Sequence, residues 1–217
     1  MDKFSFQVIS AYSISLAVIA GLIRYRYVLV EYRLFIVFVC FAIANELLSN
    51  VLIYYFKNNS TSSNIYVGIE YLILLLIFYV VNGWKKNSFY ISITLIGGTV
   101  WIFDNLVLNS ISHFNSIFRV FYSLVILLFS IDGINRILVY EKKKLFSSSK
   151  FIIFITFIIY YSYKAFIEVF YFARPELSKG FYSAIYMLML YVNFFANLAY
   201  FAAILCMPTK RKFTLQY

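Results

Sequence analysis

The sequence predicts an all-α membrane protein: a polytopic bundle of seven transmembrane helices forming one domain over residues 1–217. Hydrophobic residues make up 63% of the chain, charged residues make up 13%, and the mean hydropathy is +0.83. A soluble domain with this composition would expose large apolar patches. A helix needs roughly 20 mostly apolar residues to cross a bilayer. Seven stretches of about this length fill most of the chain: 5–23, 34–56, 64–83, 88–108, 114–138, 151–173 and 182–206.

Features along the chain support each predicted helix. The first stretch is followed by a positive cluster that begins at Arg24, with no clear small-x-small cleavage site before it, which favours a retained helix over a cleaved signal. Gly97-Gly98, midway through the fourth stretch, predicts a kink or tight packing against a neighbour. Pro175 and Pro208 lie just past the last two stretches, where a helix must stop. The connections are short, so neighbouring helices are expected to pack antiparallel.

Lysine and arginine residues collect on one side of the predicted bundle. With seven spans, the N-terminus and the connections after the second, fourth and sixth spans share a side, which holds 4 of the 19 basic residues. The other side holds 13, and the remaining 2 lie inside spans. Because positively charged short loops stay in the cytoplasm, we place the N-terminus outside and the C-terminus in the cytoplasm. The chain is therefore predicted to be a multi-pass protein of the cell inner membrane.

The net charge of +10 does not indicate nucleic-acid binding. The positive-inside bias and attraction to anionic lipid headgroups on the cytoplasmic side explain it, so the bilayer is the expected partner. The alternative is a docking surface for an acidic protein partner. Two short basic clusters would form that surface: Lys142, Lys143 and Lys144 in the connection 139–150, and Lys210, Arg211 and Lys212 in the tail.

The residues that membrane enzymes need are scarce in this chain. A hydrolytic zinc site usually takes two or three histidines, but the only histidine is His113, in a predicted outer connection. It lies at the wrong level for an intramembrane Ser–His protease, and no G-x-S-x-G motif occurs. Cys40 and Cys206 do not form a C-x-x-C pair, which argues against disulfide exchange. We therefore expect no enzyme activity, no metal site and no cofactor.

Polar side chains at membrane depth are the candidate functional residues, because they are costly there. Five ionisable side chains fall in the outer half of the bilayer when the direction of each span is followed: Glu46, Glu70, Asp104, Arg119 and Glu168. Three further residues lie nearer the middle: Lys164, Asn193 and Asn197. Six spans, the second to the seventh, thus place polar groups at a similar level. This predicts a cavity open to the outside that narrows toward the lysine and the two asparagines.

Charge within this group does not balance. Lys164 and Glu168 lie four residues apart and can pair along one helix. Arg119 then faces the other three carboxyls, so three negative charges against one positive leave −2 if all ionise. An uncompensated double charge is not stable at low dielectric. Some of these carboxyls must be protonated, reach water, or bind a cation or a cationic ligand.

A purely structural interpretation of the same residues stays open. Asp104 would lie in the headgroup layer if the boundary of its span is off by a few residues. Two ion pairs would then be plain structural ties, Glu46–Arg119 between helices and Lys164–Glu168 within one helix. Asn193 and Asn197 would join helices by hydrogen bonds.

Three stretches of the chain resemble a loose group of uncharacterised small seven-helix membrane proteins of bacteria. Residues 64–79 contain Tyr-x-x-x-Glu followed by an aromatic and aliphatic run, residues 150–171 contain FIIYYS, and residues 191–205 carry paired asparagines. The glycine usual after the FIIYYS region is absent here, and Lys164 and Glu168 stand in its place. The resemblance implies the architecture and no activity.

Binding and movement of a small ion or polar solute is the function that these observations favour. Glu46, Glu70 and Asp104 would be acidic ligands or proton carriers. Arg119, Lys164 and Glu168 would set the local charge or gate the path, and the two asparagines would line it. The alternative is a membrane sensor or an accessory subunit of a signalling or phage-defence system, which would act through the basic connection 139–150 and the C-terminal tail.

Overall fold

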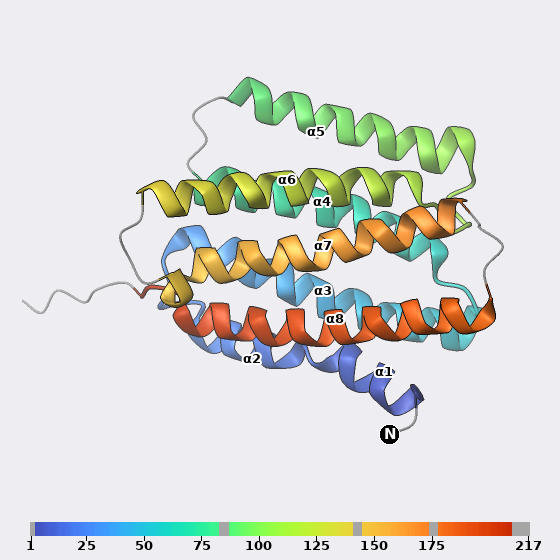
Figure 1. Cartoon of the computed structure of the whole chain (residues 1–217), viewed down its shortest axis with the longest axis horizontal. Coiled ribbons are helices and arrows are strands. Elements are labelled where there is room, and N and C mark those ends of the chain that lie inside the picture. Colours follow the sequence, from blue (N-terminus) through green and yellow to red (C-terminus); the bar gives the residue numbers. More distant parts are fainter. Residues whose placement is uncertain (1–2, 83–86, 141–144, 174–177, 210–217) are drawn as a thin grey trace, which may run out of the picture.

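A computed structural model describes residues 3–82, 87–140, 145–173 and 178–209 of the chain. Within these residues, seven helical spans are long and apolar enough to cross a membrane, as the sequence predicts. The protein is thus a multi-pass membrane protein built as a helix bundle (Figure 1). Its elements are α1 Lys3–Tyr12, α2 Ser15–Arg24, α3 Val30–Phe56, α4 Ser60–Asn82, α5 Asn87–Ile102, the π-helical turn η1 Phe103–Leu108, α6 Ile117–Tyr140, the short η2 Leu145–Ser147, α7 Ser149–Ala173 and α8 Lys179–Cys206.

The helices α4 and α8 begin before the predicted apolar stretches because polar residues support their first turns. α4 begins at Ser60 rather than at position 64, and the backbone N–H of Ser60 donates to Asn58 Oδ1 over 2.8 Å. α8 begins at Lys179 rather than at position 182, and Ser178 Oγ accepts from the N–H of Phe181 over 3.3 Å. Such caps satisfy N–H groups that no helical carbonyl reaches. Hydropathy alone therefore places these starts too late.

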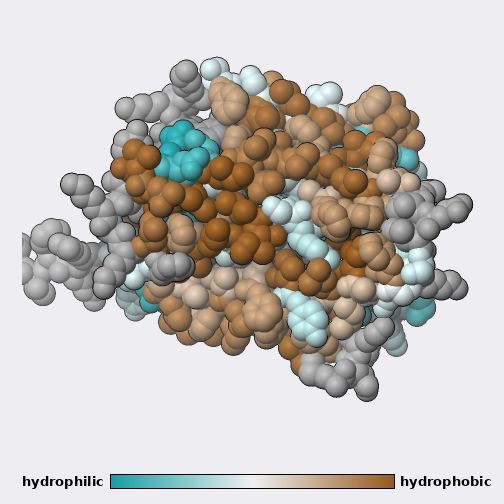
Figure 2. Space-filling model, in the orientation of Figure 1, coloured by the Kyte–Doolittle hydropathy of each residue, from teal (hydrophilic) through white to brown (hydrophobic). Residues whose placement is uncertain are grey.

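The bundle exposes many large hydrophobic side chains. The face shown in Figure 2 is predominantly hydrophobic, as expected for helices that contact lipid chains. Large hydrophobic side chains stay exposed on the spans, among them Ile19, Val51, Leu95, Leu128 and Phe195. α5 lies at one edge of the bundle, and α7 packs against α6 and α8 in its middle (Figure 1).

Aromatic rings fill the core around α7. Phe157 of α7 is fully buried, and its ring centroid lies 6.3 Å from that of Phe35, 6.0 Å from Phe78 and 5.9 Å from Tyr200. These rings come from α3, α4 and α8, and most of the pairs are edge-on, the arrangement that aromatic quadrupoles favour. The aromatic excess of the chain therefore does more than line the membrane interfaces, because it also joins four helices at the centre.

The first span is a broken helix, whereas the stretch 5–23 predicts a continuous one. At the break between α1 and α2, the carbonyl of Ser10 accepts from Ser13 Oγ over 2.7 Å. It also accepts from the side-chain amides of Asn197 and Asn193 of α8, over 3.2 and 3.3 Å. Backbone polar groups at membrane depth need partners from the protein. The two asparagines therefore stabilise the break.

The Gly97-Gly98 pair is a site of close helix contact through its first member. The hydroxyl of Tyr71 on α4 donates to the carbonyl of Ile93 on α5 over 2.8 Å, which brings the tyrosine ring across the face of α5 at Gly97. A Cβ atom added at Gly97 would overlap this ring, whereas one added at Gly98 would have no heavy atom within 4 Å. Tight packing is thus the role of Gly97.

Replacing each glycine in turn tests this packing. Gly97→Ala is expected to lower the free energy of unfolding by about 1–3 kcal/mol, because the added methyl overpacks against Tyr71. Gly98→Ala is the matched control, and it is expected to leave stability unchanged or slightly raised, since alanine favours helix over glycine by up to about 1 kcal/mol. Thermal unfolding of the detergent-purified variants measures both. Equal destabilisation by the two substitutions would contradict the assignment.

Candidate functional site

A polar cavity of about 220 Å³ lies among six of the seven spans. It runs from the first turns of α4 and α6, where Ser63 and Arg119 lie, to the middle of the bundle at Ile14 and Tyr160. The sequence predicts a cavity lined by the second to the seventh spans. In the structure the first span lines the cavity and the fourth does not. The lining residues are Ala11, Ile14, Ala42, Asn45, Glu46, Ser63, Tyr66, Val67, Arg119, Tyr160, Lys164 and Asn197.

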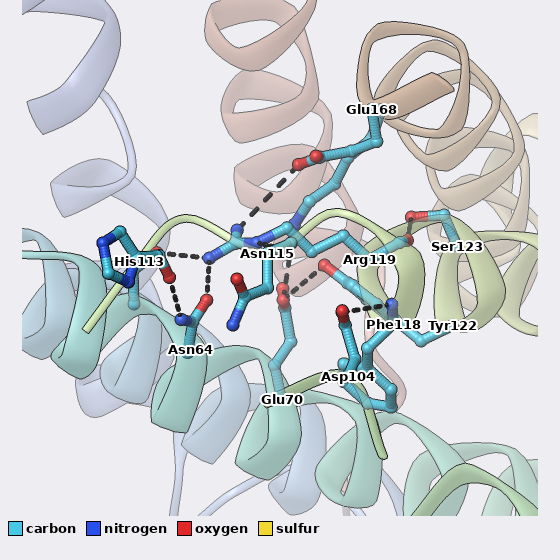
Figure 3. A network of polar contacts seen from close by, with 12 residues as sticks. Asn64, Glu70, Asp104, His113, Asn115, Phe118, Arg119, Tyr122, Ser123 and Glu168 are labelled. Carbon is cyan, nitrogen blue, oxygen red and sulfur yellow. Dashed lines mark hydrogen bonds and ion pairs between the residues drawn. The ribbon is translucent and has the colours of Figure 1, made fainter. Parts of the chain in front are cut away.

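Glu70 has more polar partners than any other carboxylate of the described residues (Figure 3). It is not among the residues that line the cavity. The hydroxyls of Tyr122 and Tyr161 donate to its two oxygens over 2.9 and 3.0 Å, and that of Tyr66 donates over 3.4 Å. Lys164 Nζ lies 3.5 Å from Oε2. Glu70 is only 3% exposed, and donors from α4, α6 and α7 surround it. A buried charge tolerates this position only because these partners replace water.

Lys164 pairs with Glu70 across helices and not with Glu168 along its own helix, so the predicted Lys164–Glu168 pair is wrong. Its ammonium lies 5.0 Å from the centroid of the Tyr122 ring and 5.6 Å from those of Tyr160 and Tyr161. Side chains of a helix point toward its N-terminus. This direction carries the ammonium away from Glu168 and toward the tyrosines one turn earlier on α7. The lysine thus sits in an aromatic enclosure closed by a carboxylate.

Arg119 ties α6 to the start of α4 and to α7. Its Nη2 donates to Ser63 Oγ over 2.7 Å and to Asn64 Oδ1 over 3.1 Å, and its Nε donates to the carbonyl of Asn115 over 3.1 Å. Its Nη1 lies 4.0 Å from Glu168 Oε1 (Figure 3). The alternative pair Glu46–Arg119 is therefore not the one that forms, because Glu168 takes that place.

Two atoms of this pair remain without a hydrogen bond. Nη1 of Arg119 makes none with the described part of the chain, and Oε2 of Glu168 is buried without a partner there. The guanidinium also lies 4.4 Å from the centroid of the Phe114 ring. The Arg119–Glu168 contact is thus a long, incompletely bonded ion pair, whereas Glu70 is closely coordinated.

Asp104 does not line the cavity, contrary to its predicted role as an acidic ligand. It is fully buried, and its Oδ2 accepts from the backbone N–H of Phe118 over 2.8 Å, while Oδ1 accepts from Asn109 over 3.1 Å. Phe118 is the second residue of α6. An acidic group at this position caps the helix and complements its dipole. The π-helical turn η1 presents Asp104 to α6, which explains a buried carboxylate without a solute.

The connection 109–116 is tied down by Asn64 of α4. The side-chain amide of Asn64 donates to the carbonyls of Ile111 and His113 over 3.0 and 2.6 Å (Figure 3). Its backbone carbonyl accepts from the indole N–H of Trp101 over 2.9 Å. His113 thus acts here through its backbone. Asn64 thus links the connection 109–116 to α4, the helix that also carries Glu70.

The two asparagines of α8 serve different surfaces. Both amides bind at the break in the first span, and Asn197 also donates to Ser13 Oγ over 2.9 Å. Asn197 lines the cavity, but Asn193 does not. Asn193 is therefore a hydrogen-bonding contact between helices, which is one of the two roles that the sequence allows for it.

Glu46 is the ionisable residue of the cavity that has no partner. It lies half-buried on α3, and no hydrogen bond or ion pair joins it to any residue that the structure describes. Asn45, next to it in the sequence, also lines the cavity without a hydrogen bond to the described residues. The candidate site is therefore a cavity whose two cations are paired and whose carboxylate, that of Glu46, has no partner among the described residues.

Sequence reasoning missed the tyrosines that coordinate Glu70. Tyr66 lies four residues before Glu70, a spacing that places both on one helix face, so this partner was visible in the sequence. Tyr122 and Tyr161 come from other helices, and no local spacing relates them to Glu70. Aromatic residues in membrane proteins usually mark the interfaces, which hides those that work in the core.

Some expectations lie beyond what the structure describes. The basic clusters Lys142–Lys144 and Lys210–Lys212, proposed as a docking surface, fall outside the described residues. Among the residues that are described, no group of three or more His, Cys, Asp or Glu side chains is arranged to hold a metal ion.

No protein-family model, curated protein or solved structure matches this chain. The likeness of three stretches to small seven-helix bacterial membrane proteins stays a prediction.

The coupling between Glu70 and Lys164 can be measured by a double-mutant cycle. Glu70→Gln alone is expected to lower the free energy of unfolding by about 3 kcal/mol or more, because it leaves the Lys164 ammonium buried without its counter-ion. The double variant Glu70→Gln/Lys164→Met removes both charges, and it is expected to recover most of that loss. Thermal unfolding in detergent provides the measurement. A double variant as unstable as the sum of the two single variants would show that the charges are not coupled.

Proposed function

We propose that the protein binds a small ion or polar solute in the cavity and moves it across the membrane. The observation that carries this proposal is Glu46: a carboxylate at membrane depth, on the wall of a polar cavity, without a protein partner among the described residues. Ionisable residues inside a membrane are costly and usually mark solute or ion pathways. A side chain kept only for packing would be expected to have found a partner.

The paired residues of the site support the same proposal. Lys164–Glu70 and Arg119–Glu168 link α4, α6 and α7 and leave their cations at the cavity surface. Structural ties account for these four side chains, but they do not require a cavity between them. The volume of about 220 Å³ lies below the range of about 300–1,000 Å³ that is typical of sites for drug-sized ligands. The cavity therefore suits a small solute.

The distribution of basic residues favours an outward-facing cavity. Arg24, Arg26, Arg33, Arg136 and Lys150 lie toward one end of the bundle, and the cavity approaches the opposite end through Ser63 and Arg119. Positively charged ends of membrane helices face the cytoplasm, so the cavity would open to the outside. An inner-membrane location of a bacterial cell fits this orientation.

The broken first span supports movement of the solute rather than binding alone. Ala11 in the last turn of α1 and Ile14 in the break itself both line the cavity. Discontinuous helices beside a site near the bilayer midplane recur in secondary transporters, where one group of helices moves against another. The break would allow α1 to move relative to α2 while the asparagines of α8 hold its backbone.

Flux through the reconstituted protein tests the proposal. Proteoliposomes under an imposed voltage or solute gradient are expected to pass at least one small solute when assayed with sodium, potassium, protons, small amines and small carboxylates. Glu46→Gln is expected to lower this flux at least about tenfold, because an interaction of the solute with a charged group contributes roughly 1.5–3 kcal/mol. Asp104→Asn, which keeps an oxygen for the α6 cap, is the control and is expected to retain the flux.

Two results would contradict transport. One is no flux of any solute from folded protein at both acidic and alkaline pH, which would favour the sensor or accessory function. The other is full flux in Glu46→Gln, which would separate the pathway from the cavity.

A further inference from the structure

The ionisable groups at the cavity and directly behind its wall carry a net negative charge. Three carboxylates, Glu46, Glu70 and Glu168, face two cations, Lys164 and Arg119, so the sum is 2 − 3 = −1 when all are ionised. Asp104 adds no binding group to the cavity, because it is used at the N-terminus of α6. A group of charges at low dielectric is stable when it is balanced. The site is therefore one positive charge short.

The missing charge belongs at Glu46. Glu70 has an ammonium at 3.5 Å and three tyrosine hydroxyls, and Glu168 has the guanidinium at 4.0 Å. Glu46 has neither an ion pair nor a hydrogen bond with any part of the chain that the structure describes. Its neighbour Asn45, whose side chain carries an amide carbonyl, lines the same cavity and makes no hydrogen bond with the described residues. The carboxylate and the amide of the cavity wall that have no partner among the described residues thus both come from α3.

The cations of the wall are poorly placed to bind an anion. Lys164 is enclosed by Glu70 and by three tyrosine rings, and its side chain is 12% exposed. Arg119 already donates from Nη2 to α4 and from Nε to the connection that precedes α6. This leaves Nη1 alone, and Glu168 lies 4.0 Å from that atom. An incoming anion would compete with the carboxylates of Glu70 and Glu168, which already pair with these cations. A cation would instead meet the carboxylate of Glu46, which has no partner among the described residues.

Size and wall chemistry favour an organic cation over an alkali ion. Since one water takes about 30 Å³ of liquid, a cavity of about 220 Å³ has room for a molecule with a carbon skeleton. A sodium or potassium ion there would have to keep most of its water. Part of the wall is apolar, from Ala11, Ala42 and Val67, and two tyrosine rings, Tyr66 and Tyr160, complete it. Aromatic faces attract ammonium groups, and the protein already holds one ammonium, that of Lys164, in this way.

We propose that the solute is a small amine in its ammonium form, with the carboxylate of Glu46 as its counter-ion and the Asn45 carbonyl as a second acceptor. This assignment rests on the proposed function and names its substrate class. The ammonium donates to the α3 acceptors, and its hydrocarbon part lies against the tyrosine and aliphatic wall. Binding brings the group of charges to zero. The same balance explains why Lys164 and Arg119 can remain at the cavity without attracting an anion.

Binding to the full-length protein in detergent tests the substrate class. Methylammonium chloride and ethanolammonium chloride are titrated against sodium chloride and sodium acetate at equal ionic strength, with the melting temperature and heat of binding as readouts. Both ammonium salts are expected to raise the melting temperature above that in the sodium salts. Glu46→Gln is expected to weaken ammonium binding at least about thirtyfold, the loss that follows removal of one partner of a buried charge pair.

Two further variants control this experiment. Glu31→Gln removes a carboxylate of the same kind that lies outside the cavity, 3.9 Å from Lys150, and it is expected to bind the ammonium ions as the wild type does. Glu46→Asp keeps the charge on a shorter side chain, and it is expected to bind more tightly than Glu46→Gln. This comparison separates loss of the counter-ion from loss of folding.

The outcomes distinguish this inference from transport itself. Equal effects of ammonium, sodium and acetate, or ammonium binding that Glu46→Gln leaves unchanged, would overturn the amine assignment. Flux of sodium or acetate but not of amines in proteoliposomes would also overturn it, while transport would stand. Ammonium binding that depends on Glu46 in a protein without any flux would support the amine assignment and contradict transport.

Discussion

A carboxylate buried between membrane helices must be surrounded by donors, and Glu70 satisfies this constraint with side chains from three helices. Its oxygens accept from Tyr66, Tyr122 and Tyr161 and pair with Lys164. Each donor fixes the position and rotation of the helix that carries it, because in a bilayer no water can replace a lost hydrogen bond. The hydrophobic effect, which drives helix packing in water, does not act between helices that are surrounded by lipid. Polar contacts and close ring packing therefore determine how α4, α6 and α7 fit together.

This arrangement determines which charges the cavity offers. Lys164 is held by Glu70, so it cannot neutralise Glu168, and Arg119 therefore pairs with Glu168 instead of Glu46. Glu46 is left free by this order of pairing and not by its own position alone. A change at Glu70 would release Lys164 and alter the charge on the cavity side of the wall. The structural interpretation of the intramembrane charges thus applies to the paired residues, whereas the proposed binding of a solute concerns Glu46.

The sequence was sufficient for what depends on length and composition. Seven stretches of adequate hydropathy predict the seven helical spans found among the described residues. Costly residues at membrane depth identify Glu46, Arg119 and Lys164 as cavity residues. Contacts between helices could not be predicted in this way. The i,i+4 spacing of Lys164 and Glu168 indicates a local pair, but the direction of the side chains and the position of Glu70 on α4 decide otherwise. Asp104 reads as a ligand because nothing local shows that a π-helical turn brings it to the start of α6. The break in the first span depends on asparagines about 180 residues later.

The central claim is that Glu46 lies in a water-accessible cavity that opens to the outside of the cell. The most direct measurement is the reaction of Glu46→Cys with a membrane-impermeant, positively charged thiol reagent added outside intact cells, in a chain whose Cys40 and Cys206 are replaced by alanine. Ala44→Cys, two residues away on a surface of α3 exposed outside the cavity, is the matched comparison. The account predicts rapid modification of Glu46→Cys and none of Ala44→Cys, because thiols react as thiolates in water and not in lipid. A folded Glu46→Cys protein that stays unmodified, or one that reacts only from the cytoplasmic side, would contradict it.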